Sequence, residues 1–358
     1  MAIRRFTLPA VVLTATLMTG LTACGSSDGK DKTSTSPAPA GAAQNAPADA
    51  NTPSASPPGT DHTGHDPGTG QPPADQAKNS GAEEPAAGDE TYFVATLTGA
   101  EEVPGNDGKA VGDKDAKATA YVRIKGDQVA FSITWEGMPA PTAAHIHQGA
   151  KGANGAVVVP FFAAPLPDTA KAATGSVTVA DQALLDRIRN NPGNWYFNLH
   201  TAEFPGGAVR GQLTKVDHKV DLDAVLKTGK PEGTLTTTAA GAQEVPNKEN
   251  KPINDPDGQA VTSVRPWGNC VDYAFSWKNV TPPTLAHVHQ APAGVNGEVV
   301  APLFAADKGL PQSITGLAGT VEGVKPEVVA AMKQNPAGFY TNLHTTEFAG
   351  GAVRGQLR

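Results

Sequence analysis

The fold is decided by an alternating stretch of the chain, QVAFSITW at residues 128–135. Large apolar side chains occupy every second position, and small or polar side chains lie between them. Successive side chains of a β-strand point to opposite faces, so the pattern predicts a strand with one buried face. The stretch CVDYAFSW at residues 270–277 alternates in the same way, with Cys270 on the outer face.

Both stretches belong to an internal repeat. Four pairs of motifs match: TGAEEVP (98–104) with AGAQEVP (240–246), AHIHQ (144–148) with AHVHQ (286–290), NLHTAEF (198–204) with NLHTTEF (342–348), and GGAVRGQL (206–213) with GGAVRGQL (350–357). A match of this length indicates a duplication. We expect one domain at 91–216, a linker at 217–232 and a second domain at 233–358.

The remaining local signals favour short strands and turns. The chain has 39 Gly and 31 Pro, too many for long helices. Asn-Gly pairs at 154–155 and 296–297 are typical of hairpin turns. One short helix is expected in each copy, before Pro192 and before Pro336, because apolar residues there share a helical face. The sequence predicts an all-β protein with two tandem Greek-key-like β-sandwich or barrel domains, each with one short helix.

The N-terminus has the pattern of an export signal. Arg4 and Arg5 precede an apolar stretch, and LTAC at residues 21–24 resembles a bacterial lipobox, in which the cysteine is acylated. The apolar run is shorter than the roughly 20 residues that a membrane span needs. We therefore expect a lipoprotein signal peptide at 1–23, lipidation of Cys24, and an extracytoplasmic protein that is anchored to the cell membrane by lipid. Cys270 then has no intramolecular disulfide partner.

Residues 24–90 are predicted to form a disordered tether rich in Pro, Ala, Gly and Ser. No Val, Ile, Leu, Met, Phe, Tyr or Trp occurs from residue 25 to residue 91. Such a segment buries too little apolar surface to offset its ordering entropy. The charge balance, 28 basic against 35 acidic side chains, offers no basic face. It excludes nucleic acid as a partner. The expected partners are the membrane, through the lipid on Cys24, and an extracellular protein.

Three histidines recur in each copy as His-x-His and a later Asn-Leu-His. Side chains two residues apart on a strand share a face, so the two imidazoles of His-x-His can reach one ion. The third imidazole joins them if its strand is a neighbour of the His-x-His strand. Nitrogen ligands of this kind suit copper or zinc, one ion per domain. Only neutral imidazole binds, so occupancy should fall below about pH 6.5. The alternative is that the histidines are hydrogen-bonded polar residues of a solvent-facing sheet. The candidate ligands are His145, His147, His200, His287, His289 and His344.

Repeated charged residues lie near these motifs in the sequence. The candidates are Glu203, Arg210, Glu347, Arg354, Glu102 and Glu244. Glu203 and Glu347 follow the third histidine by three residues, so each is a possible fourth ligand, an orienting partner of an imidazole, or an ion-pair partner of the arginine. The ion pair is the slightly favoured interpretation. Glu102 and Glu244 either approach the site or cap a turn.

The repeated motifs resemble those of the CHRD domain, a module of chordin and of exported bacterial proteins. The resemblance rests on Gly-Ala-x-Glu-Val-Pro, Ala-His-Ile/Val-His-Gln, Tyr-x-Asn-Leu-His-Thr and Gly-Gly-Ala-Val-Arg-Gly-Gln-Leu, and it covers about 250 residues. It implies an extracytoplasmic β-fold. In chordin such modules belong to an extracellular protein that binds signalling ligands.

The His-x-His strand with a later Gly-Arg segment also looks like Cu/Zn superoxide dismutase, a β-barrel. That likeness implies copper-type ligands and an anion-attracting role for Arg210 and Arg354. The dismutases have four copper histidines and a structural disulfide, whereas each copy here has three histidines and no cysteine pair. We therefore favour a non-enzymatic metal-binding protein over an enzyme. A surface adhesion module with structural histidines and a dismutase-like redox enzyme remain the alternatives.

Overall fold

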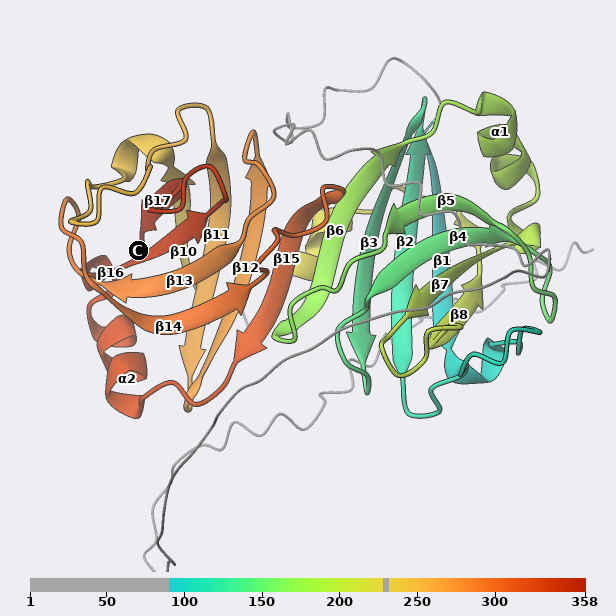
Figure 1. Cartoon of the computed structure of the whole chain (residues 1–358), viewed down its shortest axis with the longest axis horizontal. Coiled ribbons are helices and arrows are strands. Elements are labelled where there is room, and N and C mark those ends of the chain that lie inside the picture. The colour runs from blue at the N-terminus through green and yellow to red at the C-terminus, as the bar shows by residue number, and fades with distance from the viewer. Residues whose placement is uncertain (1–89, 228–231) are drawn as a thin grey trace, which may run out of the picture. The chain divides into compact units, whose positions relative to one another are not determined.

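The computed structural model describes residues 90–227 and 232–358. The expected signal peptide, the lipidation site Cys24 and nearly all of the expected tether lie outside the described residues. The described chain is built almost entirely from antiparallel strands, and the same order of elements occurs twice (Figure 1).

The first copy has nine strands and one α-helix. They are β1 (Thr91–Thr98), β2 (Lys117–Lys125), β3 (Gln128–Glu136), β4 (Ala143–Gln148), β5 (Val157–Phe162), β6 (Ala170–Thr178), α1 (Gln182–Asn190), β7 (Trp195–His200), β8 (Val209–Gln212) and β9 (Thr214–Val216). Short 3-10 turns follow β1, at Gly99–Glu101, and precede β7, at Pro192–Asn194.

The second copy repeats this order, except that the described residues include no counterpart of β9. Its elements are β10 (Leu235–Ala240), β11 (Gln259–Trp267), β12 (Cys270–Lys278), β13 (Leu285–Gln290), β14 (Glu298–Ala305), β15 (Ile314–Val321), α2 (Pro326–Gln334), β16 (Phe339–His344) and β17 (Val353–Gln356). Its 3-10 turns are Gly241–Gln243 and Pro336–Gly338, and another, η3 (Leu222–Leu226), lies in the linker.

The strands of each copy form two halves that share β1 or β10. In the first copy, β1 pairs with β2 on one side and with β8 and β9 on the other. From there the pairing continues through β3 to β6 in one half and through β7 and β4 to β5 in the other. The apolar faces of the two halves meet: the ring of Phe131 on β3 lies 4.5 Å from that of Phe161 on β5. The predicted all-β duplication is confirmed.

The two short helices occur where the sequence places them. Asp181 caps α1 by accepting a hydrogen bond from the amide of Leu184, while Leu185 and Ile188 are fully buried. Pro326 begins α2, where its missing N–H costs no hydrogen bond. Among the described residues, no helix is both long and apolar enough to cross a membrane.

Two sequence expectations about the central strands were wrong. The outer faces of β3 and β12 are covered as well, so Ala130 and Ser132 are buried, because η3 packs on this side and contacts both strands. Cys270 is also fully buried, so it does not lie on an exposed outer face.

The two copies join through equivalent edge strands. β6 pairs antiparallel with β15, with Ala173 opposite Leu317 at the centre of the register. Gly175 and Gly319 allow this close approach: a Cβ atom at Gly175 would lie 2.1 Å from the carbonyl oxygen of Ser313, and one at Gly319 would lie 2.0 Å from that of Thr169. β6 and β15 therefore belong to one antiparallel sheet.

Candidate metal centre

The three histidines of the first copy lie on two neighbouring strands. β4 pairs with β7 so that His145 is opposite Asn198 and His147 is opposite Tyr196. His200 is opposite Ala143, which places it diagonally across from His145. Ile146, between the two β4 histidines, points into the core and is fully buried, as the alternation predicts.

An irregularity in the β4–β5 pairing helps to aim the first two rings. The register shifts between Ala144 and His145 and again between Ile146 and His147. Such bulges twist a strand and redirect its side chains. The same shifts occur in the second copy, at Ala286/His287 and Val288/His289, so the device belongs to the repeated unit.

The histidines converge in both copies. In each set, one nitrogen atom per imidazole lies within 4.8 Å of the other two. In the first copy, Nδ1 of His145 is 3.3 Å from Nε2 of His200. The ring centroids of His287 and His344 in the second copy are 5.1 Å apart, the same separation as for His145 and His200. The sequence could propose this convergence, but only the strand pairing establishes it.

Backbone carbonyl groups fix the orientation of two rings in each copy. His147 Nδ1 lies 3.0 Å from the carbonyl oxygen of Gly155, and His200 Nδ1 lies 3.0 Å from that of Pro205. A carbonyl only accepts, so Nδ1 carries the proton and donates it. The lone pair of each ring is then on Nε2, facing the cluster. His289 and His344 make the equivalent bonds to Gly297 and Ala349, at 2.9 and 3.1 Å.

Four of the six inward nitrogen atoms lack partners, and the other two, Nδ1 of His145 and Nε2 of His200, contact each other. Nε2 of His147, Nε2 of His289, Nε2 of His344 and Nδ1 of His287 are all buried without a hydrogen bond. An unpaired buried acceptor carries a desolvation cost of about 1–3 kcal/mol. An imidazole that donates one N–H to a carbonyl and leaves the other nitrogen bare is arranged as metal-ligating histidines are.

Burial keeps these imidazoles neutral. It lowers the pKa of His145 to about 3, with the charges of His200 and His147 acting in the same direction. Burial likewise lowers the pKa of His147 and of His287 to about 4, and it lowers the pKa values of His200, His289 and His344. Protons therefore compete for the folded site only well below the pH of about 6.5 expected from unperturbed histidine.

Aromatic stacking holds one histidine ring of the first centre in place. The rings of His147 and Tyr196 are parallel within 7°, with centroids 4.8 Å apart. The guanidinium of Arg210 also packs on the Tyr196 ring, 3.4 Å from its centroid. The second copy repeats the stack with Tyr340 and Arg354, at 4.7 and 3.5 Å. Tyr196 and Tyr340 were not proposed as site residues, although the alternation Tyr-x-Asn-x-His already puts them on the histidine face.

The repeated arginines bind the backbone of the loop beside the site. Arg210 is 1% exposed, and it donates to the carbonyl oxygens of Ala150 and Ala153 and to Oδ1 of Asn154. Asn154 in turn donates to the carbonyl oxygen of Val103. Since the guanidinium is occupied in this way, the favoured ion pair between Arg210 and Glu203 was wrong.

The same correction applies to the second copy. Arg354 donates to Pro292, Val295 and Asn296. Glu203 and Glu347 are exposed, and over the described part of the chain neither has a hydrogen bond to a cluster histidine.

Glu102 and Glu244 are half-buried residues whose carboxyl groups are shielded from solvent at equivalent places in the two copies. Glu102 Oε2 accepts a hydrogen bond from Asn198 Nδ2 at 3.3 Å, and Glu244 accepts one from Asn342 at 3.3 Å. Burial raises the pKa of each carboxyl to about 7, against the opposing effects of the asparagine bond and the nearby arginine. Each acid is therefore linked to the histidine cluster through an asparagine. Asn198 and Asn342 lie directly across the strand pair from the first histidine of their copy.

The fold and the site define a class of protein: a tandem pair of antiparallel β domains, each with a cluster of three imidazoles. The CHRD domain model matches residues 93–213 and again residues 235–357. These ranges cover more than half of the chain, which therefore belongs to the CHRD domain family, as its motifs predict. No curated protein and no solved structure matches the chain, so the likeness to superoxide dismutase stays a prediction.

Proposed function

We propose that this CHRD protein is a lipid-anchored, extracytoplasmic binding protein that holds one copper or zinc ion in each copy. The observation that carries the proposal is the set of three inward imidazole nitrogens per copy, within 4.8 Å of one another. Histidines with a purely structural role would use both ring nitrogens, whereas four of the six inward nitrogens are buried without a partner and the other two, in His145 and His200, contact each other.

The chemistry of the ligand set fits these ions. Neutral imidazole is an intermediate donor that suits zinc and copper, with nitrogen–zinc distances of roughly 2.0–2.1 Å. Three nitrogens up to 4.8 Å apart can close on one ion with small side-chain rotations. Three protein ligands leave a coordination position for water or for another ligand. Capture or buffering of metal outside the membrane needs no more than this.

Attachment to the membrane rests on the sequence alone. The lipobox-like LTAC at residues 21–24 supports lipidation of Cys24. With the apolar-poor segment that follows, it would let the two metal-binding domains stand away from the membrane surface.

The decisive experiment is a metal count on the purified chain. The protein is loaded with copper or with zinc, freed of excess metal by gel filtration and analysed by mass spectrometry of the elements. We expect about two ions per chain. The variant H145A/H147A should retain one, and H145A/H147A/H287A/H289A should retain none. His218 is exposed and pairs only with Asp217, so H218A is the matched control and should retain two.

Two outcomes contradict the proposal. One is that the wild-type chain holds no metal at micromolar free concentration. The other is that the fourfold variant remains folded, by circular dichroism, and keeps its metal. A superoxide assay on the loaded protein separately tests the enzymatic alternative.

A further inference from the structure

The second copy contains a buried carboxylate with two donors on the outer face of its sheet. Arg265 on β11 lies directly across the strand pair from Asp272 on β12, and its guanidinium donates to Oδ2 of that residue. Thr320 on the neighbouring β15 donates its hydroxyl to Oδ1 at 2.9 Å. A guanidinium and a hydroxyl from the two flanking strands therefore hold one carboxylate that is 6% exposed.

The first copy keeps the two donors and lacks the carboxylate. Arg123 on β2 and Ser176 on β6 are both opposite Ala130 on β3, as Arg265 and Thr320 are opposite Asp272. Ala130 is also 6% exposed. Nε of Arg123, like Nε of Arg265, is buried without a hydrogen-bond partner. The duplication thus supplies an internal comparison in which the donor geometry persists and the acceptor is missing.

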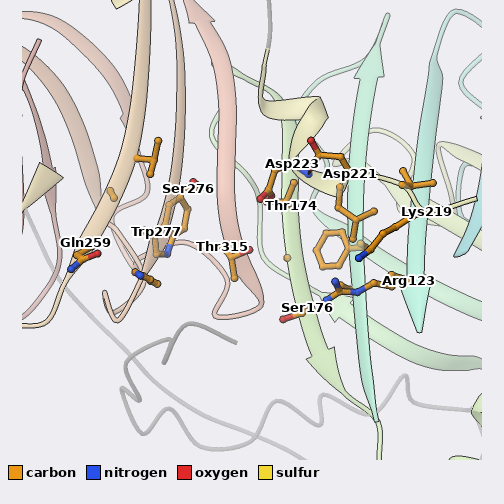
Figure 2. Close-up of a pocket in the computed structure, with 18 of the residues that line it drawn as sticks. Arg123, Thr174, Ser176, Lys219, Asp221, Asp223, Gln259, Ser276, Trp277 and Thr315 are labelled. Carbon is orange, nitrogen blue, oxygen red and sulfur yellow. Dashed lines mark hydrogen bonds between the residues drawn. The ribbon is translucent and has the colours of Figure 1, made fainter. Parts of the chain in front are cut away.

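The place of the missing carboxylate opens onto a pocket of about 1010 Å³. Arg123, Ala130 and Ser176 line it, together with Lys219 from the linker. Figure 2 shows Arg123, Ser176 and Lys219 grouped toward one end of the pocket, with Gln259 toward the other. The site therefore has room for a molecule larger than a simple ion.

The charges around this end are largely accounted for. Glu90 lies 3.1 Å from the ammonium group of Lys125 and 3.7 Å from that of Lys219. Asp221 is 2.9 Å from the ammonium group of Lys227. Asp223 is the acid that remains on the linker wall; burial and the neighbouring Asp221 raise the pKa of its carboxyl, against the opposing charges of Lys227 and Arg123. No carboxylate lies across the strand pair from Arg123, where Asp272 lies across from Arg265.

We propose that the first copy binds a small organic acid here, with its carboxylate in the position that Asp272 takes in the second copy. The carboxylate accepts hydrogen bonds from Arg123 and Ser176, beside the positive charge of Lys219. The body of the ligand is hydroxylated, as in a sugar acid, because Thr174, Ser276, Thr315 and Gln259 contribute hydroxyl and amide groups to the pocket, beside the aromatic side chains of Phe131 and Trp277. This site does not involve the histidines, so it stands independently of metal binding.

The substitution Ala130→Asp tests the idea by rebuilding the internal ion pair of the second copy. Trigalacturonate is titrated into the purified chain by calorimetry, with maltotriose as its neutral counterpart. We expect saturable binding of trigalacturonate and none of maltotriose. In A130D the new carboxylate occupies Arg123, so affinity for trigalacturonate should fall by about tenfold or more. A130S keeps a small neutral side chain and should bind as the wild type does.

A second variant protects the test against misfolding. R123Q removes the main donor and should also lose binding, while R187Q removes an exposed arginine of α1 and should not. Circular dichroism melting checks that each variant is folded. The proposal is overturned if the wild type binds no trigalacturonate, if maltotriose binds equally well, or if folded A130D and folded R123Q both bind like the wild type.

Discussion

The buried acid Glu102 gives a quantitative prediction about stability and pH. Burial raises its pKa to about 7, from 4.5 for an unperturbed side chain. Between pH 4.5 and pH 7 the native state holds a proton that the unfolded state has lost, so the free energy of unfolding rises as pH falls through this window. Above pH 7 both states are ionised, and the folded protein carries the full cost of the buried charge.

The substitution Glu102→Gln removes this titration and keeps the side-chain shape. At pH 5 the proton linkage of Glu102 contributes about 2.5 kcal/mol to native stability relative to pH 8. The variant lacks this contribution. Its stability relative to the wild type should therefore be about 2.5 kcal/mol more favourable at pH 8 than at pH 5. Any constant effect of the amide on packing cancels in this difference.

The assay is urea unfolding of the metal-free chain at both pH values, followed by tryptophan fluorescence. Glu244→Gln should behave in the same way in the second copy, where burial also raises the pKa to about 7. Glu203→Gln is the matched control, since Glu203 is exposed, and its effect should be the same at both pH values. If E102Q and E203Q show the same dependence on pH, the reasoning about buried Glu102 is refuted.

Four further predictions concern separate parts of the molecule. In the metal-free chain H145Q should reduce the loss of stability between pH 8 and pH 5 by about 2 kcal/mol, because only the unfolded state protonates His145 in this range, and urea unfolding at the two pH values measures it. R354M removes the side-chain donor of the Val295 carbonyl group and one of the two donors of the Pro292 carbonyl group, and it should cost about 3 kcal/mol in the same assay; an unchanged midpoint would contradict this role of Arg354. G319V places a Cβ atom 2.0 Å from a backbone oxygen of the partner strand, so it should lower the melting temperature and speed amide exchange in β15; normal exchange would argue against the junction. C24S should move the protein from the membrane fraction to the soluble fraction, and retention in the membrane fraction would exclude the lipid anchor.

Much of the fold follows from local pattern. The alternation at 128–135 predicts β3, and the apolar face before Pro192 predicts α1, because period and side-chain type are local properties. The covered outer faces of β3 and β12 could not be predicted. They result from the packing of η3, with Leu226 against Ala172, Ala274 and Ala318, which are distant in sequence.

The sequence likewise predicts only part of the metal centre. The sequence selects the six histidines by their repetition and their common strand face, and it assigns the chain to its family. The partners of Arg210 were missed because they are backbone carbonyl groups of a loop about 60 residues away, and a backbone group has no residue-specific signature.

By itself the sequence determined the duplication, the β-rich class and the chemistry of the candidate ligands, because each depends on residue type and on spacing along one segment. The tertiary structure decided that His200 meets His145 and His147, that Arg210 holds a loop and not Glu203, and that Arg123 lacks the carboxylate that Arg265 has. These facts depend on strand register. Register is set by the packing of whole faces against one another, and it brings together atoms that no local pattern relates.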